Sequence, residues 1–231
     1  MITVNNLSKS YSGAKVLDLP QLMIPKGQSF GLVGNNGAGK TTLFRLLLDL
    51  IRAESGTAMI NGMNVAVSDQ WKHITGAYLD QGFLIDFLSP EEFFEFTGNV
   101  KGMSKDDIQL FLHGMEEFFN GEVLNKKKLI RNLSMGNQQK IGVAAALMGR
   151  PELVLLDEPF NSLDPTTQIR LKNLVKKQMA EHQTTFLISS HDLNHVTEVC
   201  NRIVVLHQGR IEHDILTSAD TLSELEAYFA V

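Results

Sequence analysis

Short apolar runs alternate with longer amphipathic segments along much of the chain, and this pattern predicts alternating strands and helices. The predicted strands are residues 2–4, 29–33, 57–60, 153–156 and 186–189, with a hairpin of 203–206 and 210–212 around Gln208-Gly209. The predicted helices are residues 41–52, 134–149 and 221–230, together with one that begins at Asp164-Pro165, where an N-cap precedes proline. Such an alternation indicates an α/β fold with a parallel sheet.

Residues 87–149 depart from this alternation and look helical throughout. Ser104 and Asp107 have the spacing of a capping box, and apolar residues recur at helical spacing after them. Phenylalanines crowd the start of the segment: Phe83, Phe87, Phe93, Phe94 and Phe96. We expect most of them in the core of an inserted helical lobe and some along a groove for a partner, because clustered aromatics are favoured at interfaces.

A glycine-rich segment between a predicted strand and a predicted helix has the spacing of a phosphate-binding P-loop. Its residues are Gly34, Asn35, Asn36, Gly37, Ala38, Gly39, Lys40 and Thr41, followed by Thr42. Glycines allow the backbone to wrap around a phosphate, which its N–H groups and the helix N-terminus then bind. Lys40 is expected to reach the β- and γ-phosphates of a nucleoside triphosphate, and the Thr41 hydroxyl to hold Mg²⁺.

Two carboxylates, Asp157 and Glu158, follow the apolar run 153–156 directly. Side chains alternate along a strand, so adjacent acids point in different directions and can take different roles. Asp157 is expected to support Mg²⁺ through its water ligands. Glu158 is expected to polarise the water that attacks the γ-phosphate. The predicted reaction is therefore hydrolysis of the triphosphate.

Together with further segments in matching order, these motifs resemble the ATP-binding subunits of ABC transporters over nearly the whole chain. Residues 133–140 are similar to the signature motif of that family, and residues 161–164 to its D-loop. The resemblance implies a P-loop NTPase fold in one ATPase domain of residues 1–231. Its expected parts are an antiparallel β subdomain (1–29 and 55–75), a RecA-like parallel core (30–54, 76–86 and 150–231) and a helical subdomain (87–149).

The resemblance also assigns roles to single residues. Tyr11 would stack on adenine. Gln81 would coordinate Mg²⁺ through its amide oxygen and sense the γ-phosphate. His191 would hydrogen-bond that phosphate and hold Glu158 in place.

The signature segment is expected to act in trans, because the family implies a head-to-tail dimer with two ATP molecules between two chains. Ser134 would cap a helix whose N-terminus meets the γ-phosphate on the other subunit, and Gly136 would permit the close approach. The family usually has glycine and glutamine where this chain has Met135 and Asn137. Asn137 is one methylene shorter than glutamine, which reduces its reach. Asp164 suits both a helix cap and a contact across the dimer.

The expected function is ATP hydrolysis that powers a membrane transporter. Its expected partners are transmembrane permease subunits and a second nucleotide-binding subunit, identical or different. In the family, the phenylalanine-rich region receives a helix of the permease. No segment has the roughly 18 apolar residues that cross a bilayer, so a membrane role would come through a partner. The resemblance implies a cytoplasmic protein that lies on the inner face of the cell membrane through its permease. Export is favoured over import, since no C-terminal regulatory domain follows.

Composition agrees with this interpretation and keeps two alternatives in view. A net charge of −5 lacks the basic footprint of a nucleic-acid-binding protein, so no nucleic acid partner is expected. Cys200, the single cysteine, is expected to be a buried apolar residue. One alternative is a soluble ABC ATPase acting on ribosomes or DNA, although such proteins generally have paired nucleotide domains. The other is a small-molecule kinase, which would need neither the signature segment nor a dimer.

Overall fold

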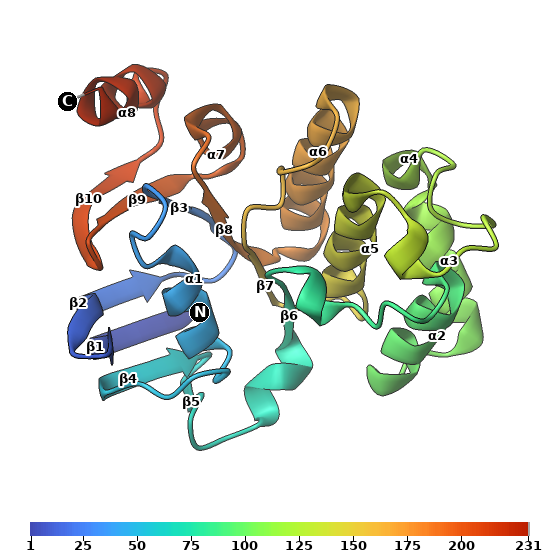
Figure 1. Ribbon diagram of the computed structural model, residues 1–231, viewed down its shortest axis with the longest axis horizontal. Helices are drawn as coiled ribbons and strands as arrows, with labels where there is room; N and C mark the ends of the chain where they lie inside the picture. Colours follow the sequence, from blue (N-terminus) through green and yellow to red (C-terminus); the bar gives the residue numbers. More distant parts are fainter. Residues whose placement is uncertain (231) are drawn as a thin grey trace.

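Residues 1–230, which the computed structural model describes, form a six-stranded sheet, a four-stranded sheet and a set of helices (Figure 1). The larger sheet has the order β10-β9-β3-β8-β7-β6, and its strands from β9 to β6 pair in parallel. The predicted parallel α/β fold is therefore confirmed, as is the hairpin of β9 and β10. The bounds are β3 (Ser29–Val33), β6 (Thr75–Tyr78), β7 (Leu153–Leu156), β8 (Thr185–Ser190), β9 (Arg202–His207) and β10 (Arg210–Leu216).

The central strands of this sheet are buried at every position, and this explains their short, nearly continuous apolar sequences. The hydrophobic pattern misses β6, which has a glycine and an alanine where β-branched residues would be typical. A Cβ added at Gly76 would lie 1.8 Å from the carbonyl oxygen of Ala146. The contact with a helix, rather than strand propensity, thus determines the residue at this position.

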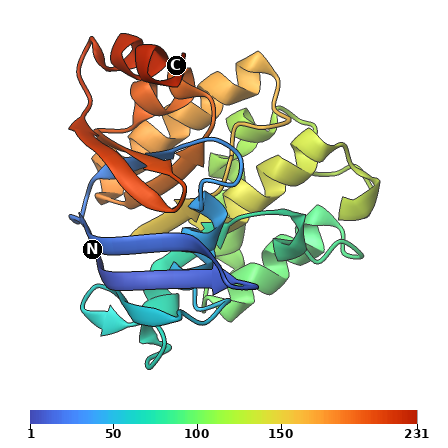
Figure 2. The same ribbon diagram turned by 60° about the vertical axis from the view of Figure 1, so that its left-hand side comes forward.

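The four-stranded sheet is antiparallel in the order β2-β1-β4-β5, and its blue and cyan strands lie below the parallel sheet in Figure 2. Its strands are β1 (Ile2–Tyr11), β2 (Ala14–Ile24), β4 (Ser55–Ile60) and β5 (Met63–Asn64). β1 extends well beyond the predicted 2–4, because the left-handed Asn6 (φ 47°) and a register shift toward β4 between Asn5 and Ser8 interrupt the alternation that the prediction relied on. The pattern also misses β2. The turn at Asn61-Gly62 is as expected, with φ of 49° and 77°.

The helical lobe lies on the right of Figure 1. Its helices are α2 (Pro90–Val100), α3 (Lys105–Gly114), α4 (Glu116–Phe119) and α5 (Met135–Leu147). The capping box of Ser104 and Asp107 is present at the start of α3. Phe93 and Phe94 are buried in the lobe, where the Phe94 ring centroid lies 5.7 Å from that of Phe119. Of the other clustered phenylalanines, two are exposed: Phe87 (63%) and Phe96 (51%).

The remaining helices cover the parallel sheet. They are α1 (Lys40–Leu47), α6 (Pro165–His182), α7 (Leu193–Val199) and α8 (Thr221–Phe229), with 3₁₀ turns η1 (Gln70–Ile74), η2 (Gln81–Phe83) and η3 (Ile130–Asn132). α1 ends before the predicted residue 52, and the left-handed backbone of Asp49 (φ 53°) follows it. Cys200 follows α7 and is buried, which raises the pKa of its thiol. In the described range, no helix is both long and apolar enough to cross a membrane.

Two apolar clusters among the described residues lie on opposite faces of the parallel sheet. Along β7, Val154 and Leu156 belong to the cluster that contains the helical lobe, α6 and α7. Leu153 and Leu155 belong to the cluster that contains α1 and the antiparallel sheet. Because successive side chains of a strand point to opposite faces, β7 contributes to both cores. This packing holds the carboxyl ends of β3, β7 and β8 at one edge, where the candidate site lies.

The contact between α5 and β6 supplies a stability test. Gly142 of α5 faces the buried ring of Tyr78, and an added Cβ would lie 2.1 Å from a ring carbon. Gly142→Ala is expected to lower the free energy of unfolding by about 1–3 kcal/mol, because a close-packed core cannot absorb the extra methyl group. Gly114→Ala, at the end of α3, is the control, since its added Cβ would meet nothing within 4 Å. Urea denaturation measures both variants, and equal stabilities would contradict this packing.

Candidate functional site

The P-loop connects β3 to α1 and needs its glycines for two different reasons. A Cβ at Gly34 would lie 2.3 Å from the carbonyl oxygen of Leu206, so packing excludes any side chain there. Gly37 and Gly39 have φ of 84° and 107°, which favour glycine. The loop borders a cavity of about 340 Å³ lined by Tyr11, Val16, Asn35, Asn36, Gly37, Ala38, Gly39, Lys40, Thr41, Thr42, Asp157 and Glu158. The structure therefore brings together the predicted P-loop residues, the predicted stacking residue and both acids.

A larger cavity of about 700 Å³ lies between α2 and α3. We place the site at the smaller cavity on chemical grounds. Of these two cavities, the smaller one has a glycine-rich backbone at a helix N-terminus together with a buried lysine and two carboxylates, and the larger one does not.

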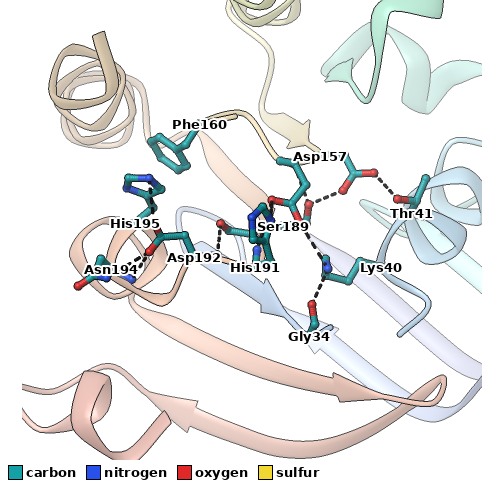
Figure 3. Close-up of polar contacts among 12 residues, drawn as sticks. Gly34, Lys40, Thr41, Asp157, Phe160, Ser189, His191, Asp192, Asn194 and His195 are labelled. Atoms are coloured by element: carbon teal, nitrogen blue, oxygen red, sulfur yellow. Dashed lines mark hydrogen bonds and ion pairs between the residues drawn. The ribbon is translucent and has the colours of Figure 1, made fainter. Parts of the chain in front are cut away.

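Lys40 is buried at the start of α1, and its ammonium group has two partners. Nζ donates a hydrogen bond to the carbonyl oxygen of Gly34 at 2.6 Å and lies 3.4 Å from Glu158 Oε1 (Figure 3). A buried ammonium without a partner would be costly, so these contacts keep the charge in place. Phosphate oxygens that enter the cavity would compete with Glu158 for the same cation.

Asp157 follows β7 and accepts hydrogen bonds from two hydroxyls. Thr41 Oγ1 donates to Asp157 Oδ2 at 2.5 Å, and the Ser189 hydroxyl donates to Oδ1. Burial raises the pKa of Asp157, while these two hydrogen bonds oppose the shift. Ser189 also accepts a hydrogen bond from the Glu158 N–H at 2.9 Å. Ser189 was not predicted as a site residue, although its position two residues before His191 at the end of a buried strand was a usable signal.

The hydroxyl of Thr41 and the carboxylate of Asp157 form a pair of hard oxygen donors that fits Mg²⁺. Residues 1–230 contain no cluster of three or more His, Cys, Asp or Glu side chains that would hold a metal by itself. The remaining ligands would then be phosphate oxygens and water. Gln81 begins the exposed turn η2 and is not among the residues described as lining the cavity. The structure thus brings Thr41 and Asp157 together, and the role of Gln81 stays a prediction.

Glu158 and His191 are paired as predicted. His191 Nδ1 lies 2.9 Å from Glu158 Oε2, and the backbone N–H of His191 donates to the same oxygen at 3.2 Å. Glu158 has a φ of 49°, so the chain turns sharply immediately after β7. With Lys40 near Oε1 and His191 on Oε2, each carboxylate oxygen has a cationic or polar partner.

The residues expected to act in trans lie on two adjacent helix N-termini. Ser134 is exposed and caps α5, where its Oγ accepts a hydrogen bond from Asn137 N at 3.3 Å. A Cβ at Gly136 would lie 2.6 Å from the carbonyl oxygen of Ser162, so α5 starts against the D-loop segment. Asp164 caps α6 by accepting a hydrogen bond from Thr167 N at 3.1 Å.

Asn137 makes a contact within its own chain, where its Nδ2 donates to the carbonyl oxygen of Glu122 at 3.4 Å. A neighbouring residue that was not singled out, Gln139, donates from Nε2 to the carbonyl oxygen of Glu158 at 3.3 Å. In the described part of the chain, none of Ser134, Gly136, Asn137 and Asp164 lines the P-loop cavity.

Comparison with known proteins agrees with the site. The family model for ABC transporters matches residues 17–161. The chain is 33% identical over 219 residues to the bacitracin transport ATP-binding protein BcrA of Enterococcus faecalis, covering 93% of this chain and 69% of the relative.

Two solved structures show the same fold. An ATP-binding subunit of an ABC transporter superposes with a TM-score of 0.88 at 25% identity, over 100% of both chains. A dimeric bacterial ABC transporter cassette superposes with a TM-score of 0.84 at 26% identity, over 95% of this chain and 100% of that one. The family match, these similarities and the geometry of the P-loop and its acids show that the chain belongs to the ABC transporter family as an ATP-binding, ATP-hydrolysing protein.

Proposed function

We propose that this chain powers a membrane transporter through ATP-driven, head-to-tail dimerisation. The observation that carries the proposal is a divided site. The P-loop cavity contains Lys40, Asp157 and Glu158, whereas the N-terminus of α5 at Ser134 is exposed and lines no part of that cavity within residues 1–230. A second subunit turned head to tail would bring its Ser134 to the open side of the bound ATP. The dimeric structure of the similar cassette supports this arrangement.

Hydrolysis follows from the contacts of Glu158. When Lys40 turns to the β- and γ-phosphates, Glu158 Oε1 loses its cationic partner while His191 still holds Oε2. Oε1 then accepts a proton from water as the water oxygen attacks the γ-phosphorus and ADP leaves. Thr41 and Asp157 would hold Mg²⁺, which supplies positive charge to the phosphates. Tyr11, 46% exposed at the mouth of the cavity, would stack on the adenine.

In the partner's half of the site, backbone groups carry the main contact. Ser134, Gly136 and the first N–H groups of α5 would bind the γ-phosphate, because a helix N-terminus favours an anion. Asn137 is engaged with the carbonyl of Glu122 and would contribute less. Asp164 keeps its role as a cap while facing the other subunit.

The expected membrane partner requires a contact surface. Phe87 and Phe96 are large exposed aromatics near the start of the helical lobe, and we propose that a permease subunit docks over them. The chain would then lie on the inner face of the membrane through that permease. Phe94, which the sequence allowed as part of such a groove, is fully buried and belongs to the core of the lobe instead. Export, rather than import, stays a prediction.

The divided site is tested by trapping the dimer. Glu158→Gln removes the general base, so hydrolysis is expected to fall at least about a hundredfold while an ATP-bound dimer accumulates. Size-exclusion chromatography with light scattering measures this. In the same background, Ser134→Asp keeps a good helix cap but places a negative charge near the partner's γ-phosphate, so the chain is expected to bind ATP and stay monomeric.

If Glu158→Gln remains strictly monomeric with ATP bound, the proposed dimer is wrong. Salt-dependent binding of RNA or DNA by the wild-type chain would instead favour an ABC ATPase that acts on nucleic acid.

The variant Asp157→Asn is expected to lower the activity without lowering the stability. Burial raises the pKa of Asp157, so as pH rises this carboxyl ionises in the unfolded chain before it ionises in the folded protein. Above the unfolded pKa, the carboxyl therefore lowers the free energy of unfolding. Asp157→Asn removes that charge, so its melting temperature at pH 7 is expected to equal or exceed that of wild type. The difference should disappear below the unfolded pKa of about 3.9. ATP hydrolysis with Mg²⁺ should fall at least about a hundredfold.

Scanning calorimetry across pH measures the stability arm. Asp106→Asn, an exposed change on α3, is the control and should leave both properties unchanged. A marked loss of stability in Asp157→Asn at pH 7 would contradict the desolvation of Asp157.

The docking surface is tested in the reconstituted transporter. The double variant Phe87→Gln, Phe96→Gln is expected to abolish most transport, while hydrolysis by the isolated subunit stays within about twofold of wild type, since neither ring lines the described P-loop cavity. Leu110→Gln, 66% exposed on α3, is the matched control. Unchanged transport, or an equal loss of hydrolysis in the isolated subunit, would refute this surface.

A further inference from the structure

His195 is a nearly buried histidine on α7 that the proposed mechanism does not use. Its side chain is 12% exposed and stacks on Phe160, with ring centroids 4.5 Å apart and planes inclined by 30°. Phe160 is itself 2% exposed and lies two residues after Glu158. The stacking therefore joins α7 to the segment that carries the general base (Figure 3).

A second contact joins His195 to the segment that carries His191. His195 Nε2 lies 3.5 Å from Asp192 Oδ2, and Asp192 is the residue directly after His191. Asp192 also caps α7, where its Oδ1 accepts a hydrogen bond from Asn194 N at 2.9 Å. One imidazole thus contacts a neighbour of each member of the Glu158–His191 pair.

The other ring nitrogen indicates the protonation state of His195. Nδ1 is buried and has no hydrogen-bond partner within residues 1–230. A proton on Nδ1 would leave a buried donor unsatisfied, so the neutral ring with its proton on Nε2 is favoured. In that tautomer the proton is on Nε2, the ring nitrogen that lies 3.5 Å from Asp192 Oδ2.

The charges around His195 come from α6, from α7 and from the two residues directly before α7. Burial lowers the pKa of His195, Asp192 and Glu198 raise it, and Lys172 and His191 lower it. Lys172 of α6 pairs with Glu198 of α7 at 2.8 Å, so these two charges largely offset each other beside the ring.

We propose that neutral His195 is a positioning residue for ATP hydrolysis, which holds α7 against Phe160 and thereby sets the contact of His191 with Glu158. It touches neither the P-loop nor the cavity in the described structure, so it acts on the chemical step rather than on ATP binding. Protonation of Nδ1 weakens this arrangement, because the added charge is buried without an acceptor. The proposal rests on the proposed roles of Glu158 and His191.

Steady-state hydrolysis of ATP by the purified protein tests the proposal. His195→Ala removes both contacts, and kcat is expected to fall about tenfold to a hundredfold, since small displacements of catalytic groups have effects of this size. KM for ATP should stay within about twofold. His195→Phe keeps an aromatic ring on Phe160 and is expected to restore kcat to within about threefold of wild type near pH 8. His113→Ala, an exposed histidine of α3, is the control.

The pH profile separates positioning from general stability. Between about pH 5.5 and 9, wild-type kcat is expected to lose activity on the acid side in a step that His195→Phe lacks. Long-range ¹H–¹⁵N spectra should show His195 as the Nε2–H tautomer at pH 8, assigned by the signal missing from His195→Phe. Wild-type kcat in His195→Ala, an Nδ1–H tautomer, or an acid limb of kcat that is identical in wild type and His195→Phe would each overturn the proposal.

The proposed roles of Glu158 and His195 can be distinguished experimentally. If Glu158→Gln hydrolyses ATP at the wild-type rate, the assigned base is wrong, and the role of His195 fails with it. If Glu158→Gln is inactive and His195→Ala is as active as wild type, only the role of His195 is wrong.

Discussion

The buried ammonium group of Lys40 is the constraint on which the site depends. A charge that is 7% exposed must be compensated, and in this structure the Gly34 carbonyl and the Glu158 carboxylate do so. The first contact fixes the curvature of the P-loop, and the second draws Glu158 back over the cavity. Glu158 makes this contact from a left-handed backbone conformation immediately after β7. The geometry of the cavity therefore follows from one cation and the groups around it.

The same loop links this cavity to the surface that faces the proposed partner. Gln139 of α5 bonds the carbonyl oxygen of Glu158, and Gly136 packs against the carbonyl oxygen of Ser162. The helix that would complete a neighbour's ATP site is thus packed on the segment that carries Glu158, the proposed base. In the proposed dimer, each subunit would connect its two half-sites through these short contacts.

Local motifs could be predicted from the sequence because their residue types are required at each position. The P-loop glycines, the Asp164 cap and the pairing of Glu158 with His191 are of this kind. Features that depend on tertiary packing were missed. Gly76 weakens the strand pattern of β6 because α5 packs directly against it. Ser189 of β8 bonds Asp157 and Glu158, which directly follow β7.

Phe94 shows that clustering of phenylalanines does not predict which of them are exposed, since one aromatic cluster contains both core and surface residues. The expected role of Gln81 rests on motif order alone, and its coordination of Mg²⁺ stays a prediction. The division into subdomains and the roles of single residues stay predictions.

The alternation along β7 has a consequence for autonomous folding. The lobe of α2 to α5 shares an apolar cluster with Val154, Leu156 and the helices beyond them. Excision of the lobe would expose the apolar side chains of α5 and the apolar side chains of the sheet that pack against them. Neither fragment would then fold independently, so the helical lobe and the rest of the chain must fold as one cooperative unit.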